Sequence, residues 1–297
     1  MTNKRPLISI CIPTYNRETY LWKCIESIVT QEWFNKEEIE IVVSDNNSTD
    51  KTEKIVEKYQ KAYGIKYFKN KNNIWANPNI LKVMWYGSWK YIRSMGDDDI
   101  ILKWWLQYVI NIIKNYNGIS FFQTNSFTKK NKEIIIYKDW IEYFKEIIYS
   151  WNRVLNLLSF SFISTLIIER EKMNKHITYR QKFSSESYSH TCLILDSIYK
   201  NKIWLLGQVI WWWNGEMSED YRRFNTKKRY EVVITNGMDK ILTHRDHFSK
   251  MNLSYREFKK YRSYFIKTHF LLKIFMLSKK FWLYTFMMSL YKKYTKK

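Results

Sequence analysis

The sequence predicts an α/β fold in which a Rossmann-like mixed sheet is flanked by helices and followed by a C-terminal helical extension. Short apolar runs rich in β-branched residues alternate with helical patterns over residues 7–95. Such alternation is typical of strands that are joined by crossover helices and pair in parallel. Polar residues follow directly on three of the apolar runs. Sheets of this kind bind ligands at the carboxyl ends of their strands, so these residues mark a candidate site.

The first unit of the pattern is a strand, a loop and a helix. Leu7–Ile12 is an apolar run closed by Pro13, which predicts a buried strand that leads into a loop. Glu18–Thr30 carries apolar residues at helical spacing, and Thr19 is a candidate cap for this helix. The pattern then recurs, with expected strands at Ile39–Ser44, Ile65–Phe68 and Lys90–Met95 and expected helices at Lys51–Tyr63 and Ile80–Gly87.

The later part of the chain carries weaker signals. Further helices are expected at Leu102–Asn115 and Asp139–Leu158. Further strands are expected at Ile119–Asn125 and Ile163–Glu169. The character changes near Gly207, after which Lys, Arg and aromatic residues dominate. We therefore expect one domain over residues 1–207, with halves at about 1–100 and 101–207, and a basic aromatic helical region over residues 208–297.

The composition fits a packed protein that attracts polyanions. Hydrophobic residues make up 45% of the 297 residues and aromatic residues 18%, which excludes a disordered chain. The net charge of +22 favours nucleic acid, anionic lipid or phosphorylated small molecules as partners. The three cysteines lie in apolar runs without metal-ligand spacing, and the N-terminus leaves no room for the apolar segment of a signal peptide. We therefore expect a reducing, cytoplasmic location.

Three consecutive aspartates, Asp97, Asp98 and Asp99, follow the strand expected at Lys90–Met95. Carboxylates this close together repel one another, and a hard divalent cation with oxygen ligands commonly neutralises them. The alternative is a solvated acidic turn in which Asp99 caps a helix that starts near Ile100. The two interpretations differ in whether a metal ion binds.

Asp45 ends a second apolar strand and is expected to face the same crevice as the aspartates. A carboxylate there can accept hydrogen bonds from a nucleobase or a ribose. The alternative is an Asx-turn in which Asp45 or Asn46 serves only the loop backbone. Two acidic loops at one crevice favour a binding site over two unrelated turns.

Three segments together resemble family 2 glycosyltransferases of the GT-A fold, in order as well as in spacing. They are Ile8–Arg17 (ISICIPTYNR), Val42–Asp50 (VVSDNNSTD) and Tyr91–Asp99 (YIRSMGDDD). The resemblance implies an inverting transferase that uses manganese or magnesium to move a sugar from a nucleotide-sugar, with uridine preferred, to an acceptor hydroxyl. It covers about the first 100 residues strongly, which would form the nucleotide-binding half, and leaves residues 101–207 as the acceptor half.

The resemblance also implies roles for particular residues. Those that wall the base pocket or contact the rest of the donor are Pro13, Thr14, Tyr15, Arg17, Asp45, Asn47, Asn73 and Asp97. The implied metal ligands are Asp98, which matches the usual ligand of the family, and Asp99. Gly96 and Asn47 depart from the family pattern, which often has aspartate and glycine at these positions. For Asn73, an ordinary solvated turn is the alternative.

A general base is also needed, because the acceptor hydroxyl must lose its proton. In similar enzymes the base lies at the start of a helix after the strand expected at Ile163–Glu169, which points to Glu186 first and His190 second. The two are four residues apart and would share one helix face. For His190 the alternative is a buried structural residue. The run Trp211-Trp212-Trp213 suits either stacking on a sugar ring or core packing.

The segment Tyr264–Lys297 combines dense aromatic and aliphatic residues with intervening lysines. This pattern is typical of a helix that lies on an anionic membrane, so we expect peripheral association with the inner face of the cell membrane and a glycan acceptor, lipid-linked or on a cell-surface precursor. No nucleic-acid-binding motif accompanies the charge, so no nucleic acid partner is expected. The alternatives are a helical cap on the first domain and a non-catalytic basic protein that keeps the GT-A scaffold and binds anionic membrane or nucleic acid.

Overall fold

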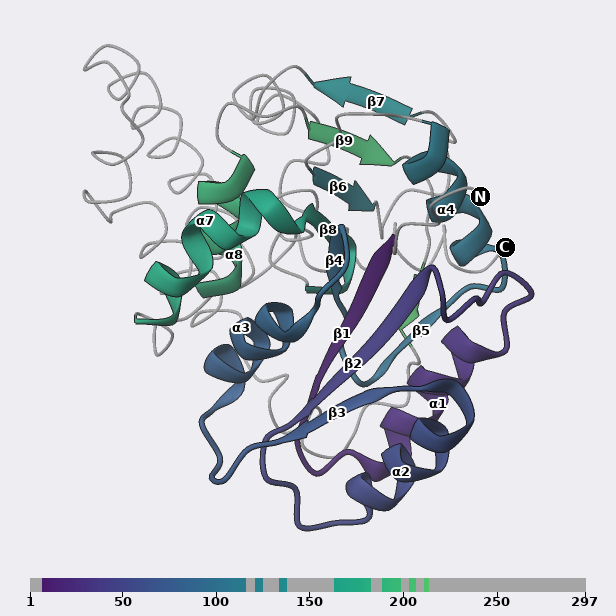
Figure 1. Ribbon diagram of the computed structural model, residues 1–297, viewed down its shortest axis with the longest axis vertical. Coiled ribbons are helices and arrows are strands. Elements are labelled where there is room, and N and C mark those ends of the chain that lie inside the picture. Colours follow the sequence, from purple (N-terminus) through teal and green to yellow (C-terminus); the bar gives the residue numbers. More distant parts are fainter. Residues whose placement is uncertain are drawn as a thin grey trace, which may run out of the picture. The chain divides into compact units, whose positions relative to one another are not determined.

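The computed structural model describes residues 7–115, 121–124, 134–137, 163–182, 189–198, 203–206 and 211–213. All of them belong to the first of two compact units, Met1–Arg222. Within this unit an eight-stranded mixed sheet is covered by helices (Figure 1), as the sequence predicts. The helix expected at 139–158, the boundary near residue 207 and the C-terminal extension lie outside the described residues.

The first half of the sheet is parallel and has the order β3-β2-β1-β4. Its strands are β1 (Ile8–Thr14), β2 (Ile39–Asp45), β3 (Lys66–Lys69) and β4 (Tyr91–Ser94). Thr14 lies opposite Asp45, so β1 and β2 end level with each other. The loops that follow these strands therefore start from one edge of the sheet.

The second half of the sheet mixes parallel and antiparallel pairs. It continues from β4 through β8 (Leu166–Glu169), β6 (Phe121–Thr124), β9 (Ile203–Leu206) and β7 (Ile134–Tyr137). Only the pair of β6 and β9 is parallel among these described strands. The strand expected from Ile163 begins three residues later, because Ile163–Thr165 forms a 3₁₀ turn, η1.

A separate two-stranded antiparallel sheet joins β5 (Asp99–Ile101) to β10 (Trp211–Trp213). Trp213 is the register partner of Asp99. Asp99 therefore begins a strand. The alternative interpretation of the sequence, in which Asp99 caps a helix near Ile100, is wrong. The pairing partner lies more than 100 residues away in the sequence, so no local pattern could indicate it.

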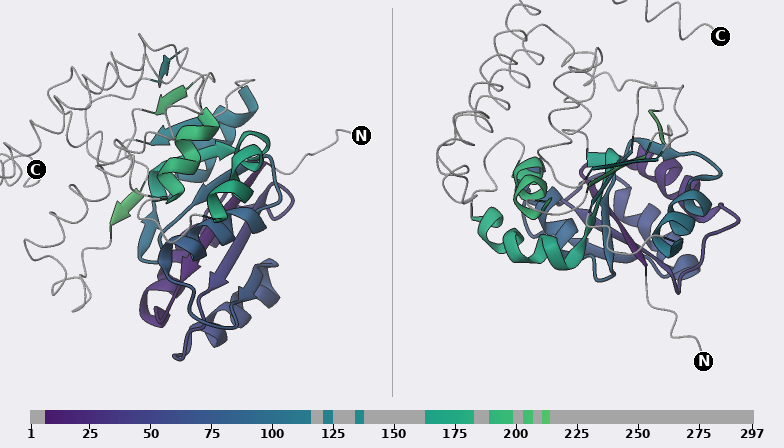
Figure 2. Two further views of the ribbon diagram at one scale, coloured as in Figure 1. Left: turned by 90° about the vertical axis from the view of Figure 1, so that its left-hand side faces the viewer. Right: turned by 90° about the horizontal axis from the view of Figure 1, so that it is seen from above.

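Helices cover the two faces of the sheet (Figure 2). One layer contains α1 (Glu18–Val29), α2 (Thr52–Tyr63) and α4 (Trp105–Asn115), and the other contains α3 (Ala76–Tyr86), α7 (Arg170–Gln181) and α8 (Ser189–Ile198). Within the part of the chain that the structure describes, every helix falls short of the length and apolar character that crossing a membrane requires.

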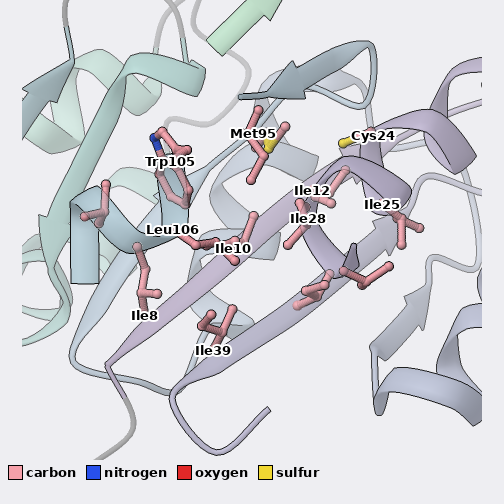
Figure 3. Packing of buried hydrophobic residues seen from close by; sticks show 14 of the residues in the cluster. Ile8, Ile10, Ile12, Cys24, Ile25, Ile28, Ile39, Met95, Trp105 and Leu106 are labelled. Atoms are coloured by element: carbon pink, nitrogen blue, oxygen red, sulfur yellow. The ribbon is translucent and has the colours of Figure 1, made fainter. Parts of the chain in front are cut away.

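The main core lies between β1 and the first helix layer. Ile8, Ile10 and Ile12 alternate along β1 and pack with residues of α1 and α4, including Ile28 and Trp105 (Figure 3). Full burial of one such aliphatic side chain contributes about 1.5–3 kcal/mol to folding. This packing fixes the strands rigidly and so fixes the starting points of the loops at their carboxyl ends.

Helix α3 begins at Ala76, four residues before the helix expected from Ile80. Asn77 and Pro78 suggest a loop in the sequence, yet both lie in the first turn of the helix. A first-turn N–H group has no acceptor within its helix, so the missing N–H of proline costs little there. Helix α4 begins at Trp105, three residues after the expected start at Leu102.

Candidate active site at the carboxyl ends of the parallel strands

The loops after β1, β2 and β4 meet at one edge of the sheet. The amide of Asn46 donates to the carbonyl of Thr14 at 2.9 Å. The hydroxyl of Thr14 in turn donates to Asp97 Oδ2 at 2.7 Å. Arg17 Nη1 lies 3.7 Å from Asp98 Oδ2. These contacts confirm the expected convergence of the three loops.

Asparagines shape the first two loops. The amide of Asn16 donates to Ser48 Oγ at 2.9 Å, and Asn16 Oδ1 accepts from the amide of Thr49 at 2.8 Å. Asn16 has φ 50° and Asn47 has φ 68°, a left-handed conformation that asparagine adopts more readily than most residues. This accounts for Asn47 at a position where the family often has glycine. Tyr15, held between these contacts, keeps 42% of its surface exposed.

The carboxylate of Asp45 is fully buried and bound by protein donors. Its Oδ1 accepts from the amide of Ser48 at 2.8 Å and from the Ser48 hydroxyl at 2.5 Å, and its Oδ2 accepts from Tyr67 Oη at 2.6 Å. Burial and then the bond to Asp45 raise the pKa of Tyr67, so this hydroxyl stays a donor. A ligand reaches Asp45 only if one of these hydroxyl groups moves. Sequence reasoning missed both Ser48 and Tyr67.

The aspartates form a tight turn headed by Gly96. The amide of Asp99 donates to the carbonyl of Gly96 at 3.2 Å, and Cys24 Sγ donates weakly to the same carbonyl at 3.5 Å. A Cβ atom at position 96 would lie 2.9 Å from Asp99 Oδ2 and 3.0 Å from Asp98 Oδ1. A side chain at position 96, where the family often has aspartate, would therefore require these two carboxylates to shift.

The three carboxylates of the turn differ in their surroundings. Asp97 is buried and accepts from Thr14. Asp99 is buried and accepts from the hydroxyl of Ser164, which itself accepts from the amide of Gly96 at 2.8 Å. Asp98 keeps 30% of its side chain exposed. It is thus the carboxylate of the turn that is most open to a ligand.

Burial and mutual repulsion disfavour negative charge on the two buried carboxyl groups of this turn. Burial raises the pKa of Asp97 to about 7, with a further contribution from the charge of Asp98, while Arg17 and Thr14 act in the opposite direction. Burial and Asp98 likewise raise the pKa of Asp99 to about 7. A cation bound beside the turn would favour the ionised form of all three carboxyl groups.

Hard oxygen donors of this kind suit magnesium or manganese. Among the described residues, no group of three or more His, Cys, Asp or Glu side chains is arranged to hold a metal ion. Asp98 fits the expected ligand by its exposure, whereas Asp99 is buried and bound to Ser164.

Arg93, on β4 below the turn, is a further charged residue that sequence reasoning missed. It is fully buried, and its Cζ atom lies 4.0 Å from the centroid of the Trp105 ring. Its three guanidinium nitrogens have no hydrogen-bond partner among the described residues. Burial lowers its pKa to about 9, against the attraction of Asp99. An arginine within an apolar strand run is the signal that could have identified it.

Asn73 joins the second loop through an asparagine network. Asn46 Nδ2 donates to Asn73 Oδ1 at 2.7 Å, and Asn46 Oδ1 accepts from the amide of Ile74 at 2.9 Å and from Asn70 Nδ2 at 3.1 Å. The amide of Asn70 donates to the carbonyl of Asp45 at 2.8 Å. The structure therefore brings Asn73 to the same edge of the sheet as Asp45.

Of the two candidate bases, the structure describes His190 alone. Glu186 lies outside the described residues. His190 is buried at the start of α8 and lines a small cavity whose other walls are mostly apolar, formed by Met84, Ser94, Ile163, Leu166, Ile168 and Ile194. An acceptor hydroxyl cannot reach this imidazole without movement of its surroundings.

The comparisons with known proteins agree with the predicted family. The sequence model of glycosyl transferase family 2 matches residues 9–177. Abequosyltransferase RfbV of Salmonella typhimurium is 30% identical over 206 residues, which are 64% of this chain and 60% of the relative. GalNAc(5)-diNAcBac-PP-undecaprenol beta-1,3-glucosyltransferase of Campylobacter jejuni is 37% identical over 99 residues, which are 33% of this chain and 31% of the relative. The chain thus spans at most 60% of the length of these two relatives.

Solved structures share the fold. Staphylococcus aureus TarS 1-349 in complex with UDP-GlcNAc has a TM-score of 0.62 and 20% identity, and the match covers 89% of this chain and 72% of that one. The mannosyltransferase PcManGT of Pyrobaculum calidifontis, solved with GDP-Man and Mn²⁺, has a TM-score of 0.55 and 11% identity, covering 89% and 75%. These similarities confirm the GT-A fold. The match over residues 9–177, more than half of the chain, shows that the chain belongs to glycosyl transferase family 2.

Proposed function

We propose that this protein is an inverting, metal-dependent glycosyltransferase that moves a sugar from a nucleotide-sugar to an acceptor hydroxyl. The observation that carries the proposal is the convergence of three loops through the contacts of Thr14 with Asn46 and Asp97 and of Arg17 with Asp98. A nucleotide-sugar needs sites for a base, a diphosphate and a sugar along one crevice. This edge of the sheet offers exposed aromatic and amide groups at one end and carboxylates at the other.

The donor that we propose is a UDP-sugar. TarS, which shares the fold, has been solved with UDP-GlcNAc, and this is the support for uridine. Tyr15, Asn47 and Asn73 are the accessible groups near the base end, with Pro13 and Thr14 shaping the loop wall. Asp45 lies beneath them and holds the loop through Ser48. Its direct contact with a base or ribose requires the Tyr67 or Ser48 hydroxyl to move.

Asp98 is the proposed metal ligand. Magnesium and manganese are commonly held by one or two carboxylates, with substrate phosphates and water completing the shell. A bound metal would stabilise the negative charge that develops on the departing diphosphate. Arg17 now faces Asp98 at 3.7 Å and is placed to contact a donor phosphate instead. Asp97 and Asp99, fixed by Thr14 and Ser164, hold the turn that presents Asp98.

The base proposed for the acceptor hydroxyl is Glu186, with His190 as second candidate. A carboxylate that takes the proton on the face opposite the leaving diphosphate would give inversion at the anomeric carbon. Glu186→Gln is expected to lower turnover by about 100-fold or more while leaving donor affinity unchanged. Nuclear magnetic resonance of the product would report the anomeric configuration, and retention would contradict the proposed mechanism.

The acceptor that we propose is a glycan precursor that is either lipid-linked or destined for the cell surface. We propose that the transfer takes place at the cytoplasmic face of the membrane. The name of one relative, GalNAc(5)-diNAcBac-PP-undecaprenol beta-1,3-glucosyltransferase, contains an undecaprenol-linked glycan, which supports a lipid-linked acceptor. The net charge of +22 favours an anionic membrane surface as partner. The free thiols of Cys11 and Cys24, both buried, fit a reducing compartment.

The test is the release of nucleoside diphosphate from a panel of nucleotide-sugars with Mn²⁺, Mg²⁺ or a chelator. We expect metal-dependent release from one donor or a few, abolished by Asp98→Asn. Glu171→Gln, the same change at a side chain that is 73% exposed on α7, is the matched control and should leave release unchanged. Nucleotide binding without turnover of any donor would favour the non-catalytic alternative, and absence of binding would exclude the proposal.

A further inference from the structure

Trp75 lies in the segment between β3 and α3 (Figure 1) in a conformation that an L-amino acid rarely adopts. Its φ is 71° and its ψ is 165°, a combination found almost only in glycine. Its side chain is 79% exposed, whereas the other exposed large hydrophobic residues among those described reach at most 43%. Both features oppose folding, because the backbone is strained and a large apolar surface stays in water.

Hydrogen bonds on both sides hold Trp75 in this conformation. Its amide donates to Asn73 Oδ1 at 2.8 Å, and its carbonyl accepts from the amide of Asn79 at 3.2 Å. The preceding amide, that of Ile74, donates to Asn46 Oδ1 at 2.9 Å. Asn46 and Asn79 are buried, whereas Asn73 is exposed. The network fixes the backbone and leaves the indole outside.

The same network places Trp75 at the donor edge of the sheet. Asn46 binds the residue before Trp75 through its side chain and binds Thr14, the residue before Tyr15, through its amide. Asn46 thus binds the residues that directly precede two exposed aromatic residues, Tyr15 and Trp75. These two hydrogen bonds of Asn46 fix the distance between the backbones of Tyr15 and Trp75.

The strand order indicates which part of a donor lies near Trp75. The aspartate turn follows β4, and Trp75 follows β3, at the opposite end of the order β3-β2-β1-β4. Three strand spacings, about 14 Å, separate the two ends. A donor with its diphosphate at Asp98 has its reacting sugar at the aspartate turn. The base lies at the other end of the donor, toward β2 and β3.

We propose that Trp75 stacks on the nucleobase of the donor and so contributes to the affinity for the nucleotide. The inference rests on the proposed function, because it takes the diphosphate to lie at Asp98. A nucleobase offers a flat π-face on which an indole can stack, and stacking would cover the exposed apolar surface of Trp75. The strained backbone then serves to present the ring at the binding edge.

The test uses the full-length chain and compares Trp75→Gly with wild type by calorimetric titration of UDP and of inorganic pyrophosphate, each with Mn²⁺. Loss of one base–aromatic stack should weaken UDP binding by about 5- to 150-fold. Pyrophosphate has no base, so its affinity should not change. Glycine removes the backbone strain, so the melting temperature should stay the same or rise.

Two further variants serve as controls. Trp75→Phe keeps an aromatic face and should bind UDP within about threefold of wild type. Trp85→Ala removes another partly exposed tryptophan, on α3, and should leave UDP affinity unchanged.

Equal UDP affinity in wild type and Trp75→Gly would overturn the inference and leave the proposed function intact. Equal losses of UDP and pyrophosphate affinity would also overturn it, because they would indicate a collapsed loop. Failure of the wild-type protein to bind UDP or any other nucleotide would contradict the proposed function itself.

Discussion

At the scale of single residues, the aspartate turn depends on the absence of a side chain at position 96. The carboxylates of Asp98 and Asp99 fold back over Gly96, so a Cβ atom at this position would require both carboxylates to shift. Asp98 is partly exposed and can move, whereas Asp99 is buried and bound to Ser164. A substitution at Gly96 therefore acts on the position of Asp99 and the shape of the turn.

Gly96→Ala is expected to lower the free energy of unfolding by about 1–3 kcal/mol, because a methyl group is forced into a packed turn. It should also weaken metal-dependent nucleotide binding, because it changes the shape of the turn that presents Asp98. Thermal melting and UDP titration would measure the two effects. Gly64→Ala is the control, since Gly64 has φ 71° and an open surrounding. That change should lower stability alone, and an equal loss of UDP affinity in both variants would contradict the assigned role of Gly96.

At the scale of elements, the sequence indicates helices and strands well where the pattern is local. The helix predicted at Glu18–Thr30 ends one residue earlier at Val29, and the strands before Asp45 and Gly96 lie where their apolar runs predict. Strand β5 could not be predicted, because its stability depends on pairing with Trp211–Trp213, far along the chain. The early start of α3 was hidden by Pro78, whose cost disappears in a first turn.

Glu40, on β2, links three strands through its buried carboxylate. It accepts from Ser9 Oγ at 2.6 Å and from the amide of Ser88 at 3.1 Å, and it pairs with Lys66 Nζ at 2.6 Å. Burial raises its pKa, but the bonds from Lys66, Ser9 and Ser88 outweigh burial, and the net shift is downward. Ionised Glu40 therefore stabilises the fold above the unfolded pKa of about 4.3. This contribution is lost as the pH falls through the lower pKa of the folded state.

Glu40→Gln is expected to lower the free energy of unfolding at pH 7 by about 1–3 kcal/mol, since the amide cannot satisfy all the donors. The difference from wild type should shrink as the pH falls below about 4. Urea unfolding at several pH values would measure it. The exposed Glu171→Gln should show no such dependence, and a difference that persists unchanged at pH 3 would refute this role of Glu40.

At the scale of the whole molecule, the GT-A fold and the family follow from the first hundred or so residues, and the comparisons confirm both. The convergence of three loops was predictable from strand order alone, because parallel strands end at one edge. The partners within the site were not. Tyr67 and Ser164 come from a strand and a turn without a polar motif, and Arg93 stands alone in an apolar strand run. Only three-dimensional packing brings these side chains to Asp45 and the aspartate turn.

The sequence of Tyr264–Lys297 predicts that the whole chain associates with a membrane. Deletion of Ser263–Lys297 is expected to release the protein from liposomes that contain anionic lipid while UDP affinity stays unchanged. Co-sedimentation with anionic and neutral liposomes would measure the effect, and high salt should weaken binding of the full chain. Unchanged co-sedimentation after the deletion would refute the predicted role of this segment.

The proposed function depends most on Asp98, which we propose holds a metal ion that binds the diphosphate of a nucleotide donor. The most direct measurement is the dissociation constant of UDP with Mn²⁺ and with a chelator, for wild type and Asp98→Asn. We predict that Mn²⁺ tightens UDP binding to wild type by about tenfold or more, a gain of at least about 1.4 kcal/mol, and that Asp98→Asn loses this gain. Equal affinity with and without Mn²⁺ in wild type, or an undiminished Mn²⁺ effect in Asp98→Asn, would contradict the claim.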